Sequence, residues 1–184
     1  MRCPDLHSGP LLLAALLLSG CPPSEPGPEQ PESVTLARYD GWVRVTDPSE
    51  DLFADQRPSS AVCDDAGYLF DPLTQTLEVQ TELCDYLTVA QPTLVELAPG
   101  DEVHVFAYHD LLTAPEPAQG YMALALGDQI EWEYNVAIPG DPGVVEAQFT
   151  IDRALPAGTP MQFHVHNHGP NTWELAAVLA SVGG

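Results

Sequence analysis

Apolar and polar residues alternate with a period of two along much of the chain. In residues 103–108 Val and Ala alternate with His, Phe and Tyr, and in residues 129–138 Ile, Trp, Tyr and Val alternate with Gln, Glu and Asn. Successive side chains of a strand point to opposite faces of its sheet, so this alternation predicts strands with one buried face. Further strands are predicted at residues 34–39, 42–46, 76–81, 86–90, 121–126, 144–151, 161–168 and 172–180.

Turn residues separate nearly all of these segments. Pro and Gly cluster at residues 99–101, 139–143 and 169–171, at the spacing typical of two packed sheets. Amphipathic segments of helical length are missing after residue 21. We therefore expect an all-β fold with one β-sandwich domain over residues 33–184, either jelly-roll or immunoglobulin-like, with the strand order left open.

The first 20 residues have the three zones of an export signal. Arg2 precedes the apolar run of residues 11–18, and the small residues Ser19 and Gly20 follow that run. Eight apolar residues in a helix cover about 12 Å, whereas the hydrocarbon core of a bilayer is about 30 Å thick. Residues 1–20 are therefore predicted to be a cleaved signal peptide.

The signal peptide ends in Leu18-Ser19-Gly20-Cys21, which resembles the cleavage and lipidation box of bacterial lipoproteins. This resemblance implies a diacylglyceryl group in thioether linkage on Cys21, and therefore a lipid-anchored protein of the bacterial cell envelope. In that family an Asp after the cysteine signals retention in the inner membrane. Position 22 is Pro, so the resemblance favours the outer membrane. Plain secretion is the alternative.

The residues after Cys21 are predicted to form a stalk. Residues 22–32 read PPSEPGPEQPE, a composition that cannot form a core and that prefers the extended polyproline conformation. At about 3.1 Å per residue, such a linker can hold the domain up to about 34 Å from the lipid surface. The predicted organisation is therefore signal peptide, lipidated linker over residues 21–32, and sandwich.

The charge of the chain excludes several kinds of partner. The formal net charge is −22, and all five basic residues are arginines. Such a surface repels phosphate backbones and anionic lipid headgroups, which argues against nucleic-acid binding and against electrostatic membrane attachment. The lipid on Cys21 is then the expected membrane anchor, and a protein or a carbohydrate is the expected ligand.

Two cysteines remain once Cys3 is cleaved off and Cys21 is acylated. Cys63 and Cys84 are expected to form a disulfide, because export from the cytoplasm permits oxidation. Closing the loop between them stabilises the fold by about 3 kcal/mol in the chain-entropy model. The alternative is a pair of free buried thiols.

A histidine-rich strand is the strongest candidate for chemistry. His164, His166 and His168 stand at every second position, with Phe163 and Val165 on the opposite side, so the imidazoles should share the face turned away from the core. A three-residue turn at 169–171 would pair this strand with the last one and set His166 opposite Glu174. In the same register Val165 faces Leu175, Phe163 faces Ala177 and Met161 faces Leu179.

This arrangement predicts a transition-metal site as one possibility. His164, His166 and Glu174 could present two nitrogens and an oxygen to Zn²⁺, Cu²⁺ or Fe²⁺, with His109 completing the shell. A solvated polar face and a pH-sensing surface are the alternatives. Gly158, followed after five residues by His164-Val165-His166, resembles the opening of the first cupin motif, which implies metal ligation by both histidines. Cupins place their glutamate three or four residues later on the same strand, whereas Glu174 lies eight residues later.

Two glutamates give a third possibility. Glu131 and Glu133 share one face of a predicted strand, as the acid and nucleophile of some jelly-roll glycosidases do, although the rest of that motif is absent. Trp132 and Trp173 are expected to pack in the core, and the place of Trp42 is left open.

The first functional hypothesis is a non-enzymatic binding or structural module. A metal-binding protein is the second hypothesis, and a polysaccharide hydrolase is the third.

Overall fold

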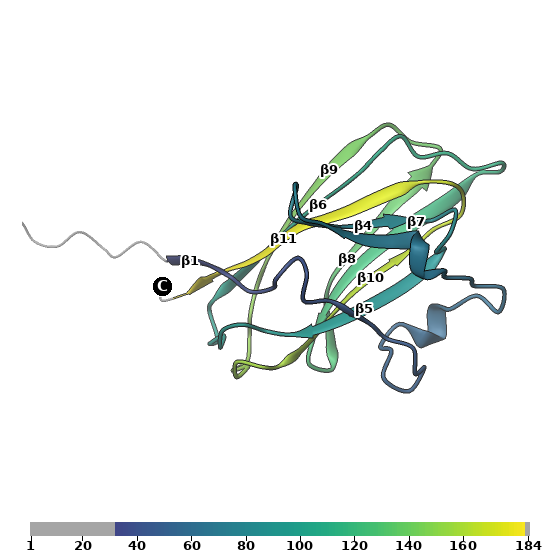
Figure 1. Cartoon of the computed structure of the whole chain (residues 1–184). Coiled ribbons are helices and arrows are strands. Elements are labelled where there is room, and N and C mark those ends of the chain that lie inside the picture. Colours follow the sequence, from purple (N-terminus) through teal and green to yellow (C-terminus); the bar gives the residue numbers. More distant parts are fainter. Residues whose placement is uncertain (1–31, 183–184) are drawn as a thin grey trace, which may run out of the picture.

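The computed structural model describes residues 32–182 and shows two antiparallel sheets packed face to face (Figure 1). This confirms the predicted all-β sandwich. The predictions for the signal peptide, Cys21 and the stalk up to residue 31 lie outside the described residues, as do residues 183–184. No helix in the described part is long and apolar enough to cross a membrane.

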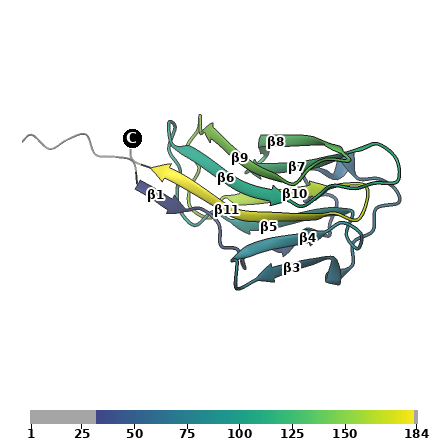
Figure 2. The ribbon, with the colours of Figure 1, turned by 90° about the horizontal axis from the view of Figure 1, so that it is seen from above.

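Sheet A has the order β3-β4-β11-β6-β9, with β1 paired to the end of β11, and sheet B has the order β2-β5-β10-β7-β8 (Figure 2). In sheet A the strands are β1 (Glu32–Thr35), β3 (Tyr68–Asp71), β4 (Thr76–Gln80), β6 (Glu102–His109), β9 (Gly143–Thr150) and β11 (Thr172–Val182). In sheet B they are β2 (Val43–Arg44), β5 (Tyr86–Pro92), β7 (Ala118–Leu126), β8 (Gln129–Ile138) and β10 (Pro160–His166). Two short 3-10 turns, η1 (Ala54–Gln56) and η2 (Asp65–Gly67), complete the elements.

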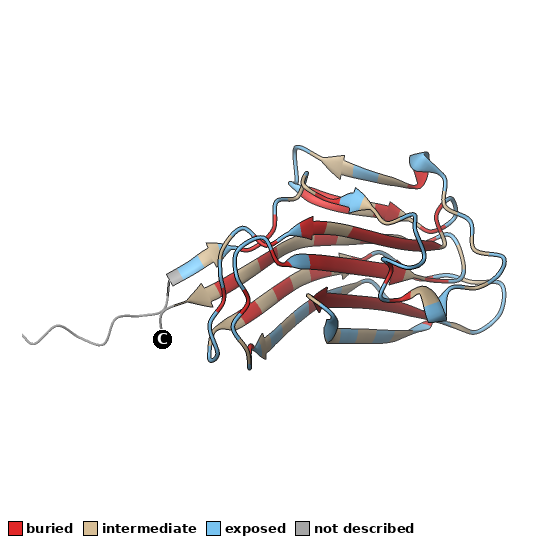
Figure 3. Cartoon of the chain, turned by 90° about the horizontal axis from the view of Figure 1, so that it is seen from below, coloured by how far each residue is buried: buried red, intermediate tan, exposed pale blue. Residues whose placement is uncertain are grey.

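The core lies between the sheets and follows the alternation in the sequence. Val103, Val105 and Ala107 of β6 are buried against Phe163 and Val165 of β10 in one cluster. Buried residues concentrate on the central strands, whereas the connecting loops are exposed (Figure 3). Trp173 is completely buried, Trp42 is buried against Phe163, and Trp132 packs on the edge of the core.

The predicted pairing of the last two strands is wrong. β10 lies in sheet B between β5 and β7, whereas β11 lies in sheet A between β4 and β6. Val165 and Leu175 both point into the core, as predicted, but they approach it from opposite sheets. The turn at residues 169–171 therefore crosses from one sheet to the other.

A bulge in β11 changes which of its residues face inward. The register with β6 shifts between Leu175 and Ala177. As a result Val178 and Ala180 are buried, whereas Ala177 and Leu179, which were expected on the core face, are only partly buried. An extra residue in one strand reverses the alternation beyond it.

The long connection after β2 lies on the outer face of sheet B. We call residues 46–62 the strap, the segment below β5 in Figure 1. At its start, the Val45 N–H donates to the Thr88 carbonyl of β5. At its end, the predicted disulfide between Cys63 and Cys84 is confirmed. Both ends of the strap are therefore attached at or next to β5.

The sandwich has two distinct ends. β1 and the last residues of β11 lie together at one end, which we call the near end (Figure 1). The loops at residues 81–85, 110–117, 139–142 and 167–171 form the opposite end, which we call the far end. The described chain thus starts at the near end.

Candidate functional site

The histidines of β10 lie on the outer face of sheet B, as the alternation predicted. His164 is flanked by Thr88 of β5 and Ala123 of β7, whereas His166 is flanked by Tyr86 and Tyr121. The ring of His166 stacks against both tyrosines, at centroid distances of 6.2 Å and 4.9 Å. A row of three rings therefore crosses the far end of this face.

The strap covers the part of this face around His164, and the sequence analysis did not predict this cover. Phe53 stacks on the His164 ring with centroids 4.5 Å apart and an interplanar angle of 14°. Gln162 holds the strap in place: the Leu52 N–H donates to its Oε1 at 3.1 Å, and its Nε2 donates to the Glu50 carbonyl at 2.6 Å. His164 consequently has 0% exposure instead of facing solvent.

A buried carboxylate of the strap organises the polar groups beneath it. Asp51 accepts hydrogen bonds from the Tyr86 hydroxyl at 2.8 Å, from Thr88 Oγ1 at 2.9 Å and from the Phe53 N–H at 2.9 Å. Three donors compensate the burial of this carboxylate. Burial and the hydrogen bond to Asp51 raise the pKa of Tyr86, so its hydroxyl stays protonated and donates.

The donor count assigns the tautomers of both histidines. Thr88 has one hydroxyl hydrogen and gives it to Asp51, so it must accept from His164 Nδ1, which lies 2.8 Å away. Burial lowers the pKa of His164 well below its usual range, so the ring is neutral and its Nε2 is an acceptor. His166 Nδ1, at 2.9 Å from that Nε2, must therefore donate. When His166 is neutral, its own Nε2 carries a free lone pair.

The surroundings of His166 combine aromatic rings with polar side chains. The guanidinium of Arg57 lies over the Tyr86 ring, 5.2 Å from its centroid. The Tyr121 hydroxyl donates to Glu133 Oε1 at 2.6 Å, and burial together with this bond raises the pKa of Tyr121 to about 12. Burial, followed by the charge of His168, lowers the pKa of His166.

The predicted metal ligands do not come together. Glu174 lies in sheet A, where it accepts from the Tyr108 hydroxyl and from Thr76 Oγ1 at 2.9 Å, so its predicted contact with His166 is wrong. His109 is buried, with its ring 5.0 Å from that of Trp173. Among residues 32–182, no group of three or more His, Cys, Asp or Glu side chains is placed to hold a metal ion. The ring nitrogens of His164 and His166 instead bond to each other.

The two glutamates of β8 are engaged separately. Glu131 forms an ion pair with Arg153 at 2.6 Å, whereas Glu133 accepts from Tyr121. β8 pairs with β7 irregularly at this point, because the register shifts between Leu124 and Ala125. Each carboxylate thus has a structural partner of its own.

Two hollows at the far end meet at Pro115 and His168. The first has a volume of about 550 Å³ and is lined by Ala114, Pro115, Glu116, Pro117, Ala118, Gln119 and His168. The second has a volume of about 430 Å³ and is lined by Thr81, Glu82, Asp85, Pro115, Asn167, His168, Gly169 and Pro170. We call them together the far-end groove. Its walls combine proline rings with acidic and amide side chains.

Asn167, one of the residues that line this groove, has a buried side-chain oxygen without a hydrogen-bond partner among the described residues. Its Nδ2 donates to Thr81 Oγ1 at 2.7 Å. Thr81 gives its own hydrogen to the Gly169 carbonyl at 2.7 Å, so it can only accept from Asn167, which fixes the orientation of the amide. Asn167 is 2% exposed, and its Oδ1 has no hydrogen-bond partner among the described residues. Sequence reasoning missed this residue because it stands between two histidines of the predicted strand 161–168, whereas β10 ends at His166.

Gly169 fixes the shape of the groove. Its φ is +110°, and a Cβ there would lie 2.1 Å from the Thr113 carbonyl oxygen. We expect Gly169→Ala to destabilise the domain by about 2–4 kcal/mol, because it combines backbone strain with a backbone clash. Urea unfolding followed by tryptophan fluorescence measures this loss. Gly100→Ala is the control. Its φ is +103°, but a Cβ there would meet no atom within 4 Å, so only backbone strain should lower the free energy of unfolding of this variant. Equal losses would refute the role of the clash.

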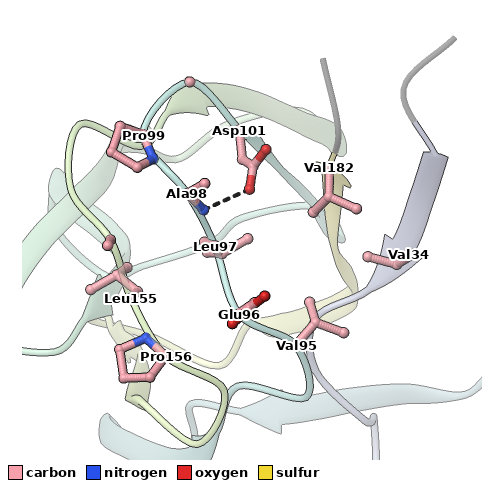
Figure 4. Close-up of a pocket in the computed structure, with 12 residues that line it drawn as sticks. Val34, Val95, Glu96, Leu97, Ala98, Pro99, Asp101, Leu155, Pro156 and Val182 are labelled. Atoms are coloured by element: carbon pink, nitrogen blue, oxygen red, sulfur yellow. Dashed lines mark hydrogen bonds between the residues drawn. The ribbon is translucent and has the colours of Figure 1, made fainter. Parts of the chain in front are cut away.

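The near end has a hollow of about 710 Å³ with a mainly apolar lining (Figure 4). Val34 of β1 and Val182 of β11 form one side, and Leu155 and Pro156 form another. The Ala98 N–H donates to Asp101 Oδ2 at 2.7 Å and closes the turn above the hollow. This hollow lies beside the point where the described chain starts.

Fold and surface together define a β-sandwich with one covered sheet face and a groove at its far end. No protein-family model matches the chain, and no curated protein matches it. Among solved structures, it is similar to the CBM61 module solved with β-1,4-galactotriose, at 8% identity over 78% of this chain and 89% of that one, with a TM-score of 0.44.

Two further similar structures are also carbohydrate-binding modules. One is a CBM4 structure, at 14% identity over 78% of this chain and 96% of that one, with a TM-score of 0.42. The other is the C-terminal CBM6 of LamC, a laminarinase from Zobellia galactanivorans, at 9% identity over 82% and 98%, with a TM-score of 0.38. The likeness is confined to the β-sandwich fold.

Proposed function

We propose that this protein is a lipid-anchored binding module of the bacterial cell envelope that takes its ligand in the far-end groove. The observation that carries the proposal is the unpaired Oδ1 of Asn167, a buried acceptor in the wall of that groove. A buried polar atom without a partner costs about 1–3 kcal/mol, and a ligand that donates a hydrogen bond to it recovers this energy.

The position of the groove supports this function. The described chain starts at the near end, so a lipid on Cys21 would place the near end toward the membrane. The groove lies at the opposite end, where it is open to molecules arriving from outside. The acidic surface opposes close contact with anionic headgroups, which also favours a domain held away from the bilayer.

The lining favours a neutral ligand rich in hydroxyl groups, such as a carbohydrate. Asn167 requires a donor, and Glu82, Asp85 and Glu116 add acceptors around the groove. These carboxylates repel phosphates and uronic acids. Pro115 and Pro117 provide apolar surface for the carbon skeleton of the ligand. A neutral sugar meets all of these conditions.

NMR titration of the ¹⁵N-labelled mature domain tests the proposal. The probes are neutral β-1,4-linked oligosaccharides of glucose, xylose and galactose, with oligogalacturonate as the anionic comparison. We expect at least one neutral probe to shift the Asn167 side-chain amide and the His168 backbone amide, and oligogalacturonate to shift neither. If every neutral probe leaves both signals unchanged, the proposed ligand class is wrong.

Variants locate the binding. Asn167→Ala should weaken binding of the neutral probe about tenfold, which corresponds to one hydrogen bond of about 1.4 kcal/mol. His168→Ala changes an exposed wall of the groove without disturbing the core, and it should also weaken binding. His104→Ala, on the outer face of sheet A, is the control and should bind as the wild type does. Unchanged binding by both groove variants would place the ligand elsewhere.

A further inference from the structure

We propose that the strap is a pH-operated cover over the His164–His166 pair. The cover stays closed while the pair is neutral or carries one extra proton, and it opens when the pair carries two. The observation behind this is the directional chain of hydrogen bonds that begins at Asp51 of the strap, passes through Thr88 and ends on the two histidines of β10. Every bond in this chain has a fixed direction, so added protons have defined consequences.

The first added proton leaves the chain intact. It binds the free Nε2 of His166, which points away from the chain, while His166 Nδ1 continues to donate to His164. The second proton has only one place to bind, His164 Nε2, which already receives that hydrogen. Two N–H groups would then face each other across 2.9 Å. The doubly protonated pair must therefore separate.

Separation of the pair requires the strap to move. His164 is enclosed by Phe53 above it and by Tyr86, which meets its ring edge-on with centroids 4.5 Å apart. A charged imidazole in this enclosure has no water around it, and burial of such a charge is unfavourable. Moving Phe53 away gives His164 access to water, so opening is the way in which the pair accepts its second charge.

Some charged groups around the pair favour its protonation, and others oppose it. Asp51 attracts a proton toward His164, but three hydrogen bonds already satisfy it. His168 repels a charge on His166, and Arg57 of the strap adds positive charge over the neighbouring Tyr86 ring. The other titratable groups on the strands that pack against the pair are Tyr86, Tyr121 and, through Tyr121, Glu133. Both tyrosines remain neutral, so they do not offset a second charge.

The sign of the pH dependence follows from the two histidines. In the closed state the pKa of each is lowered, whereas in an open, solvated state each returns toward the ordinary value of about 6.5. The open state therefore binds more protons below pH 6.5. The opening equilibrium should increase by up to about tenfold per pH unit for each histidine as the pH falls below that value, and the strap should stay closed above it.

Hydrogen exchange followed by mass spectrometry tests this cover in the full chain, after correction for the intrinsic pH dependence of exchange. We expect protection of the backbone amides of residues 52–57 to fall tenfold or more between pH 7.5 and pH 5.0, while the amides of β6 keep theirs. Equal loss in β6 would indicate general acid unfolding, and unchanged protection of the strap would refute the proposal.

Variants separate the histidines from other acid effects. His164→Phe keeps a ring against Phe53 but does not titrate, so the strap should lose most of its pH dependence. His164→Asn, which keeps a donor for Thr88, serves the same purpose if the larger ring is not accommodated. His104→Phe is the matched control on sheet A and should retain the wild-type response. A strap that still opens at pH 5.0 in both His164 variants would overturn the role of the pair. None of these measurements depends on ligand binding at the far-end groove.

Discussion

Replacement of Cys21 by serine is expected to release the protein from the membrane fraction completely. The thioether link requires sulfur, and each buried methylene of an acyl chain contributes about 0.8 kcal/mol to membrane binding, so loss of the lipid removes many kilocalories per mole at once. A net charge of −22 offers no electrostatic substitute. Metabolic labelling with an alkyne analogue of palmitate and detergent phase partition measure the change.

Cys3→Ser is the matched control. Cys3 lies in the predicted signal peptide, so this variant should keep its label and stay in the detergent phase. If Cys21→Ser also keeps the label and stays in the detergent phase, the protein is attached to the membrane in another way and the lipoprotein hypothesis is wrong. If neither variant carries label and the wild type is found in the culture medium, plain secretion is the correct interpretation.

Replacement of Trp173 by alanine is expected to destabilise the domain by about 3–5 kcal/mol. Trp173 has 0% exposure near the start of β11, its ring lies over Gly120 of β7, and His109 packs against it. A Cβ on Gly120 would lie 2.6 Å from the indole, so sheet B is shaped to fit this ring. Alanine would leave a large cavity between the sheets. The free energy of unfolding in urea measures the loss.

Trp132→Ala is the comparison that makes this result specific. Trp132 is only half-buried at the edge of the core, so its loss should cost less than half as much. Similar losses for the two variants would mean that the core is not centred on Trp173. A loss below 1 kcal/mol for Trp173→Ala would mean that the sheets close around the vacancy.

The period-two pattern predicted most strands because each has one face on the core. β3 was missed, since its four residues, Tyr68–Asp71, are too short to show alternation. The disulfide was predicted correctly from the two cysteines that remain once Cys3 and Cys21 are assigned to the predicted signal peptide and lipidation site. The strands could be predicted from the local sequence, and the disulfide from the number of cysteines.

The candidate site could be predicted only in part. Alternation placed His164 and His166 on the outer face of their strand correctly, but it does not specify which strand lies beside it. A hairpin and a crossing between sheets bury the same residues, Val165 and Leu175 among them, so the pattern could not distinguish the two. The prediction of a contact between His166 and Glu174 was wrong for this reason.

The covering of His164 could not be read from its own strand. It depends on Asp51 and Phe53, more than 100 residues earlier, and on Tyr86 and Tyr121 of the neighbouring strands. The Leu52-Phe53 pair, the two large apolar residues in the middle of a mostly polar loop, was the local signal that this segment packs against the sheet. Contacts between distant segments require the strand order, which a single sequence does not provide.

The attachment of the strap at both ends limits how far it can travel. The Val45 N–H is bonded to Thr88 before the strap, and Cys63 is covalently joined to Cys84 after it. Phe53 thus stays tethered to the same side of sheet B even after it leaves its docking place. Redocking is an intramolecular step whose rate does not depend on protein concentration, so each molecule can repeat the cycle without exchanging partners.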